Sequence, residues 1–220
     1  MAADGRRVIL DRVRAALGDR EPPPAPDAGP LPPAPAEDLV DLLVDRLVDY
    51  RARVSVVGPE AAGVAVAALL AEAGAERAVV PPGLPAQWHP AGVAVVEDAP
   101  GIGARDLDAI GHVVTGCALA VADTGSLVFD HGAGQGRRAL TLVPDHHVCL
   151  VREDQIVGSL TDAFRALADA GTAGRPVTFV SGPSATSDIE LRRVEGVHGP
   201  RRLDVVIVAD RAEREGPGPG

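Results

Sequence analysis

Hydrophobic positions follow two different spacings along this chain. In some segments apolar residues recur every three or four positions, which predicts helices over residues 6–17, 39–48, 60–72 and 160–170. Elsewhere short apolar runs are bounded by glycine, proline or other turn residues, which is typical of buried strands. These runs lie at residues 54–57, 78–80, 93–96, 113–121, 126–129, 140–144, 147–151, 177–180 and 203–208. Strands that alternate with helices predict an α/β fold, with a mixed, mostly parallel sheet and helices on both faces.

Proline divides the chain into parts. Residues 20–36 are rich in proline and predict an extended or disordered linker, because proline breaks helices and central strands. The linker separates an N-terminal helix in residues 1–19 from one domain over residues 37–210. Residues 211–220 contain Gly-Pro repeats and are expected to be disordered. Two alternatives remain for the first helix: it docks on its own domain or a neighbouring subunit, or it is a loosely held arm.

The composition of the chain argues against several classes of function. Of the 220 residues 46% are hydrophobic and only 2% aromatic, so the core must be aliphatic. The formal net charge is −10 and aromatic residues are few, which argues against a nucleic-acid binder. No apolar run is long enough to span a membrane, and the N-terminus lacks the apolar core of a signal peptide. We therefore expect a cytoplasmic protein.

Cysteine usage argues against a redox cofactor in this chain. Cys117 and Cys149 each lie inside an apolar run, as small buried residues do in a reducing compartment. Two cysteines without a Cys-x-x-Cys spacing cannot supply the four thiolates of a typical iron–sulfur cluster. We expect no cofactor and no metal in the chain itself.

A first candidate site follows the run at residues 177–180. Gly182 and Pro183 end that run, and Ser184 or Thr186 then predicts a helix cap, with Asp188 in the first turn. The free backbone N–H groups of such a strand–loop–helix joint favour an anionic ligand. His198 follows between two glycines. The alternative is a tight structural joint followed by a surface histidine.

A second candidate site lies in the centre of the chain. Asp123, Thr124 and Gly125 predict a turn between two apolar runs. Arg137 and Arg138 end a glycine-rich loop and are candidate anion clamps, because a planar guanidinium matches a carboxylate or phosphate. The alternative is that these arginines pair with surface carboxylates.

Histidines also occur among the apolar runs at residues 140–151. Asp145, His146 and His147 are consecutive and raise the question of an acid–base set or a metal site. Adjacent residues on a strand point to opposite faces of the sheet, so both histidines cannot easily bind one metal. The pattern favours structural, hydrogen-bonded histidines.

Five motifs in order along the chain carry a resemblance to a known family. They are TGCALAVADTGSLV at residues 115–128, GRRAL at 136–140, LVPDHH at 142–147, SGPSATSDIE at 181–190 and GVHGP at 196–200. Together they closely resemble the LUD-domain family of lactate-utilisation proteins, in particular its protein C group, over roughly residues 38–208. One motif departs from the common family pattern, because Asp123 stands where Glu-Thr-Gly usually begins.

The resemblance implies both a fold and a role. It implies an α/β fold similar to that of the ribose-5-phosphate isomerase and CoA-transferase group (the NagB/RpiA fold). It also implies a part in oxidising L-lactate to pyruvate, beside partner subunits that hold iron–sulfur clusters. Whether this chain is itself catalytic, or is a regulatory, scaffolding or substrate-binding component, stays open.

The same resemblance suggests one pocket for a small carboxylate such as lactate or pyruvate. The pocket would combine Asp123, either Arg137 or Arg138, and the loop of residues 182–186. Asp123 or His198 would move a proton or orient the substrate. The further binding candidates are Thr124, Gly125, Gly182, Ser184, Thr186 and Asp188. The alternative is that Asp123 only caps its turn, and that the pocket is a relic or a docking surface for partner subunits.

A stand-alone enzyme of the same fold group is the alternative function. It would be a CoA transferase or resemble 5-formyltetrahydrofolate cyclo-ligase. The cyclo-ligase would need a nucleotide site, normally with lysine, and this chain has none. The CoA transferase would favour glutamate at position 123, because aspartate is shorter by one methylene. Both observations argue against this alternative.

Overall fold

The computed structural model describes residues 2–18, 38–172, 175–183, 199–209 and 214–215. Helix α1 (Ala2–Leu17) belongs to a unit of its own, residues 1–32, and is described by itself. Its apolar side chains Val8, Ile9, Val13 and Leu17 are exposed by 43–63%. The helix is therefore amphipathic, with its hydrophobic stripe uncovered within that unit.

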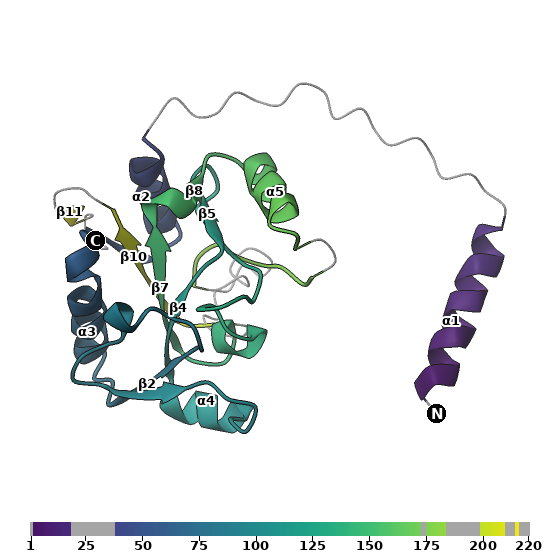
Figure 1. The fold of residues 1–220 in the computed structure, drawn as a ribbon, viewed down its shortest axis with the longest axis horizontal. Helices are drawn as coiled ribbons and strands as arrows, with labels where there is room; N and C mark the ends of the chain where they lie inside the picture. The colour runs from purple at the N-terminus through teal and green to yellow at the C-terminus, as the bar shows by residue number, and fades with distance from the viewer. Residues whose placement is uncertain (1, 19–37, 173–174, 184–198, 210–213, 216–220) are drawn as a thin grey trace, which may run out of the picture. The chain divides into compact units, whose positions relative to one another are not determined.

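A seven-stranded sheet forms the centre of the second unit (Figure 1). Its spatial order is β11-β1-β10-β7-β4-β2-β3, and every neighbouring pair is parallel except β1 with β11. The strands are β1 (Arg53–Val57), β2 (Arg77–Val80), β3 (Ala94–Glu97), β4 (His112–Gly116), β7 (His146–Arg152), β10 (Arg202–Val208) and β11 (Arg214–Glu215). The fold class predicted from the sequence is confirmed.

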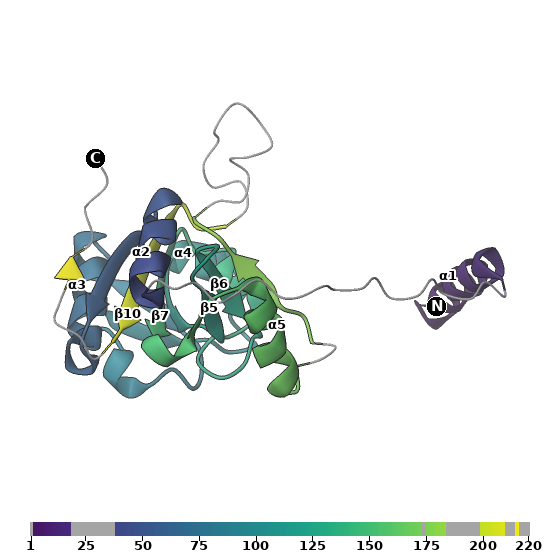
Figure 2. The ribbon, with the colours of Figure 1, turned by 90° about the horizontal axis from the view of Figure 1, so that it is seen from above.

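Helices cover both faces of this sheet (Figures 1 and 2). Alternation along β7 divides its side chains: Val148 and Leu150 pack with α3 (Ala62–Glu72), whereas Cys149 and Val151 pack with α2 (Leu39–Asp49). A smaller apolar cluster joins α4 (Ala104–Ile110) to β2 and β4. Because both faces are buried, the central strands are mostly apolar, and their polar residues lie mainly where β4, β7 and β10 begin.

A second, four-stranded sheet lies beside the first and was not predicted. Its order is β8-β5-β6-β9, with β8 (Ile156–Val157), β5 (Leu119–Val121), β6 (Ser126–Phe129) and β9 (Thr178–Val180). One face shares the core of the large sheet, and the other packs against α5 (Leu160–Asp169). Short 3-10 turns complete the described elements: η1 (Pro59–Ala61), η2 (Ala86–Trp88), η3 (Arg138–Thr141) and η4 (Glu153–Gln155).

Several sequence-based boundaries were wrong. The run at residues 113–121 is two strands, β4 and β5, which belong to different sheets. The predicted strand at residues 140–144 is not a strand, because the amide of Leu140 bonds back to the carbonyl of Arg137 and forms η3. Helix α4 was missed, and within the tail predicted to be disordered, Arg214 and Glu215 form β11.

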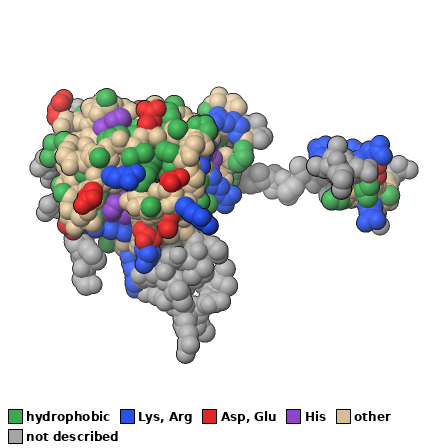
Figure 3. Space-filling model, turned by 90° about the horizontal axis from the view of Figure 1, so that it is seen from below, with side chains coloured by type: hydrophobic (Ala, Val, Ile, Leu, Met, Phe, Trp, Pro, Cys, Tyr) green, Lys and Arg blue, Asp and Glu red, His purple; other side chains and the backbone are tan. Residues whose placement is uncertain are grey.

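No helix among the described residues is long and apolar enough to cross a membrane. On the face drawn in Figure 3, acidic and basic side chains are interspersed with hydrophobic ones.

Candidate functional site

The Asp123–Gly125 turn joins β5 to β6, as the sequence predicted. The side chain of Asp123 is exposed, and its backbone carbonyl accepts a hydrogen bond from Arg46 Nε of α2 at 3.2 Å. Gly125 has φ +60°, and a Cβ added there would lie 2.8 Å from the Cβ of Arg46. The turn is therefore fixed against α2, and glycine is required at its last position.

A chain of hydroxyl groups connects this turn to the start of the second candidate loop. Thr124 Oγ1 donates to Ser126 Oγ at 2.9 Å, and Ser126 Oγ lies 2.7 Å from Ser181 Oγ. Gly182 follows with φ +84°, packed so closely on Tyr50 that an added Cβ would lie 2.9 Å from that residue's Cβ. The structure thus brings the turn and the beginning of the loop together. Ser184, Thr186, Asp188 and His198 lie outside the described residues.

Arg137 does not lie at this junction. Its guanidinium makes a forked ion pair with Asp98, with Nε 3.1 and 3.0 Å from the two carboxylate oxygens and Nη2 2.8 Å from Oδ1. Arg137 also follows the loop that leaves the opposite end of β6 from Asp123. Arg137 thus pairs with a carboxylate, as the alternative expected, although Asp98 is buried and not at the surface. Arg138 is exposed, and its side chain has no bonded partner within the described part of the chain. Anion binding by Arg138 stays a prediction.

A cavity of about 260 Å³ lies between the small sheet and α5, beside Arg152 at the end of β7. The carboxyl end of a parallel strand is a position where α/β proteins commonly bind ligands. Polar and apolar groups share the lining, among them Asp130, Arg152, Asp154, Gln155, Leu119 and Leu167.

The polar groups of this cavity are held in different ways. Asp130 is fixed, because its Oδ1 accepts from Gln135 Nε2 at 2.6 Å and from the Gly132 amide at 3.0 Å. Arg152, by contrast, pairs with Asp154 at 2.9 Å in an exposed ion pair, half of its side chain being open to solvent. Such pairs are weak, so a ligand carboxylate can replace Asp154. Sequence reasoning missed these residues; the one signal was an arginine that directly follows a long apolar run.

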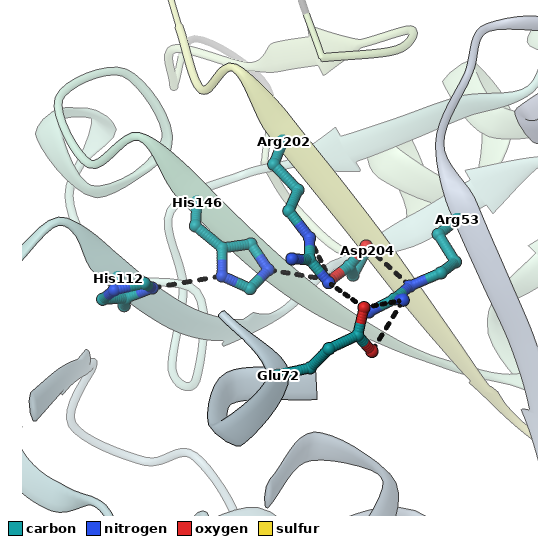
Figure 4. Close-up of polar contacts among 6 residues, drawn as sticks. All are labelled: Arg53, Glu72, His112, His146, Arg202 and Asp204. Carbon is teal, nitrogen blue, oxygen red and sulfur yellow. Dashed lines mark hydrogen bonds and ion pairs between the residues drawn. The ribbon is translucent and has the colours of Figure 1, made fainter. Parts of the chain in front are cut away.

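A buried polar network occupies the opposite edge of the sheet, where β1, β4, β7 and β10 begin (Figure 4). His146 Nε2 lies 2.8 Å from Asp204 Oδ2, and His146 Nδ1 lies 3.1 Å from His112 Nδ1. Arg202 Nε donates to the same Asp204 oxygen at 2.9 Å. Burial raises the pKa of the Asp204 carboxyl, but hydrogen bonds from His146 and Arg202 outweigh burial and leave it below its ordinary value.

Two further residues extend the network to α3. Arg53 Nη1 donates to both carboxylate oxygens of Glu72 at 2.7 and 2.8 Å, and its Nε lies 3.4 Å from Asp204. Glu72 ends α3, so these ion pairs connect the helix to the edge of the sheet.

His147 points to the other face of β7, as expected for adjacent strand residues. It is fully buried, its Nε2 lies 2.7 Å from Thr115 Oγ1, and its ring lies near Phe129. Burial, assisted by the neighbouring His146, lowers its pKa to about 3. His146 and His147 are both hydrogen-bonded within the fold, as the sequence favoured. Among the described residues, no group of three or more histidine, cysteine or acidic side chains is arranged to hold a metal.

Comparison with known proteins gives a consistent result. The sequence model of the LUD domain matches residues 102–208. A protein of Deinococcus radiodurans named Lactate utilization protein C is 44% identical over 209 residues, which cover 94% of this chain and 96% of the relative. The chain belongs to the LUD-domain family.

Other members and a solved structure agree with this assignment. Lactate utilization protein C 1 of Bacillus mycoides is 35% identical over 102 residues, covering 44% of this chain and 43% of that protein. A crystal structure of a DUF162 family protein from Deinococcus radiodurans superposes with a TM-score of 0.69 at 41% identity, covering 79% of this chain and 99% of that one. The family recognised from the motifs, and its α/β fold, are therefore confirmed.

Proposed function

We propose that this chain takes part in the oxidation of L-lactate to pyruvate as the component that binds the small hydroxy acid and contains no cluster. The 44% identity to a relative named Lactate utilization protein C, over nearly the whole of both chains, supports the role in lactate utilisation. Similarity at this level and coverage makes a shared biological role the simplest account.

The observation that carries the binding role is the cavity between the small sheet and α5, beside the end of β7. It combines a guanidinium, Arg152, with a fixed carboxylate, Asp130, and apolar side chains such as Leu119. L-Lactate presents a carboxylate, a hydroxyl and a methyl group. In this proposal Arg152 pairs with the substrate carboxylate, Asp130 accepts a hydrogen bond from the hydroxyl, and the apolar wall contacts the methyl group.

Partner subunits complete the reaction in this account. Conversion of lactate to pyruvate removes two electrons and two protons, and the electrons need an acceptor. The two cysteines of this chain are both buried and form no disulfide; Cys149 lies in β7, and Cys117 follows β4. We therefore propose that iron–sulfur clusters in partner subunits accept the electrons, while this chain holds or delivers the acid. Asp123, Arg138 and His198 stay candidates for contacts to the substrate or to these subunits.

Calorimetric titration of the full chain with L-lactate tests the binding role. Arg152→Gln is expected to weaken lactate affinity at least tenfold, because the charge-assisted pair is lost. Arg165→Gln is the matched control: Arg165 also forms an exposed ion pair, with Asp162 at 3.3 Å, and does not line the cavity. Equal affinities in wild type and both variants, or no binding by the wild type, would contradict the assignment.

A further inference from the structure

Three side chains at the start of β4, β7 and β10 form a continuous hydrogen-bonded chain from the protein interior to solvent (Figure 4). Asp204 is the inner end, with 1% of its side chain exposed, and His146 is nearly as buried at 4%. His112 is the outer end and is half-buried. Its second ring nitrogen, Nε2, has no hydrogen-bond partner among the described residues. Because it is not among the unpaired atoms that are buried, it is accessible to solvent.

The hydrogen bonds determine where the protons lie. Asp204 is ionised near neutral pH, because Arg202 and His146 hold its pKa low, so His146 Nε2 must carry the hydrogen that bonds to it. A neutral His146 then has only a lone pair on Nδ1. His112 must therefore donate from its own Nδ1 across the 3.1 Å contact, which leaves His112 Nε2 as a free acceptor. The neutral histidine side chain in water favours hydrogen on Nε2, so this form is the reverse of that expected for an unconstrained surface histidine.

We propose that His112, His146 and Asp204 form a proton-uptake relay, in which His112 Nε2 accepts a proton from solvent or an acidic ligand and passes charge inward to His146. When Nε2 gains a proton, the hydrogen between the two Nδ1 atoms can move to His146. His112 then stays neutral, while His146 becomes an imidazolium beside the Asp204 carboxylate. One proton enters, one is transferred, and no bond other than these N–H bonds changes. The relay lies at the amino edge of the sheet and is separate from the proposed lactate cavity.

Charges on the surrounding elements decide when the relay takes up its proton. Burial, the neighbouring His146 and Arg202 lower the pKa of His112, while Asp145 opposes them. Around this core lie Arg201 beside Asp145, Asp108 of α4 near Arg201, the Arg53–Glu72 pair of β1 and α3, and His147 on the far face. The pKa of His112 is therefore held below the ordinary histidine value, and its Nε2 is a free acceptor at neutral pH.

Nitrogen-15 NMR of the uniformly labelled full chain tests the proposal. The His112 ring is assigned from the signals that disappear in His112→Gln, a half-exposed position where the change should not prevent folding. The expected result is His112 with hydrogen on Nδ1 at neutral pH, and signals of His112 and His146 that shift together at one midpoint on acidification. His89, whose Nε2 contacts only the carbonyl of Leu84 at 3.2 Å, serves as the internal comparison.

Two outcomes would overturn the relay. One is His112 with hydrogen on Nε2 at neutral pH. The other is a His112 titration during which the His146 signals do not move. His146→Phe adds a second check, since removal of the acceptor should return His112 to the Nε2–H form; an unchanged tautomer in a folded variant would also reject the relay. Lactate affinity enters none of these readouts, so failure here and failure of the proposed function are distinct.

Discussion

Acidification should reveal the cost of keeping His147 neutral inside the core. The ring is fully buried between β4 and the small sheet, where Thr115 and Phe129 contact it, and its Nδ1 atom has no hydrogen-bond partner among the residues that the structure describes. Burial lowers its pKa from 6.5 to about 3. A histidine with a lowered pKa in the folded state favours unfolding as pH falls, because only the unfolded chain gains the proton.

The magnitude follows from the two pKa values. Near pH 7.5 both states leave His147 neutral and the site contributes nothing. At pH 5 the unfolded residue is protonated and the folded one is not. Because pH 5 lies about 1.5 units below the ordinary pKa of 6.5, the free energy of unfolding falls by about 2 kcal/mol. The loss continues until about pH 3, where the folded residue also gains a proton.

Urea unfolding of wild type and His147→Gln between about pH 7.5 and pH 5 measures this effect. Glutamine places an amide near the position of Nε2, which keeps a partner for Thr115 but cannot be protonated. The variant should be less stable at pH 7.5, yet lose about 2 kcal/mol less than wild type on acidification. Other titrating groups, including His112, are common to both proteins and cancel in the difference. Parallel pH curves for the two proteins would refute the reasoning.

Two further predictions concern fixed turns and ion pairs. Gly125→Ala should destabilise the fold by about 2 kcal/mol or more in urea unfolding, because φ is +60° and the new Cβ would meet Arg46 at 2.8 Å; an unchanged midpoint would show that the turn relaxes freely. Arg137→Leu should cost about 1–3 kcal/mol, since Asp98 would lose its partner with 7% of its side chain exposed. Arg138→Leu is the control in the same urea measurements and should change stability little. Equal losses of stability in the two variants would contradict the Arg137–Asp98 pairing.

Much of the fold could be predicted because most strands are short apolar runs bounded by turn residues. The valine-rich runs of β1 and β10 are largely buried, so composition alone indicated them. The division of residues 113–121 between two sheets could not be predicted, because the run is apolar throughout. Only pairing decides it: Thr115 of β4 lies beside Cys149, whereas Ala120 of β5 lies beside Ile156.

The candidate site shows the same limit. The turn at Asp123 and the opposite orientations of His146 and His147 follow from local pattern, and both were predicted. The partner of Arg137 is 39 positions away at Asp98, and that of His146 is 58 positions away at Asp204. No local spacing reveals such pairs, so the sequence left Arg137 between an anion clamp and an ion pair, and the polar network was missed.

Pyruvate formation from L-lactate by material captured with the tagged chain tests the central claim most directly. The full chain would be purified from lactate-grown cells of its source under gentle conditions, and assayed together with its visible spectrum. The account predicts co-purifying subunits with iron–sulfur absorption and lactate-dependent pyruvate formation, which falls when Arg152→Gln is the captured chain. A colourless, single chain from cells that oxidise lactate equally well without it would contradict the account.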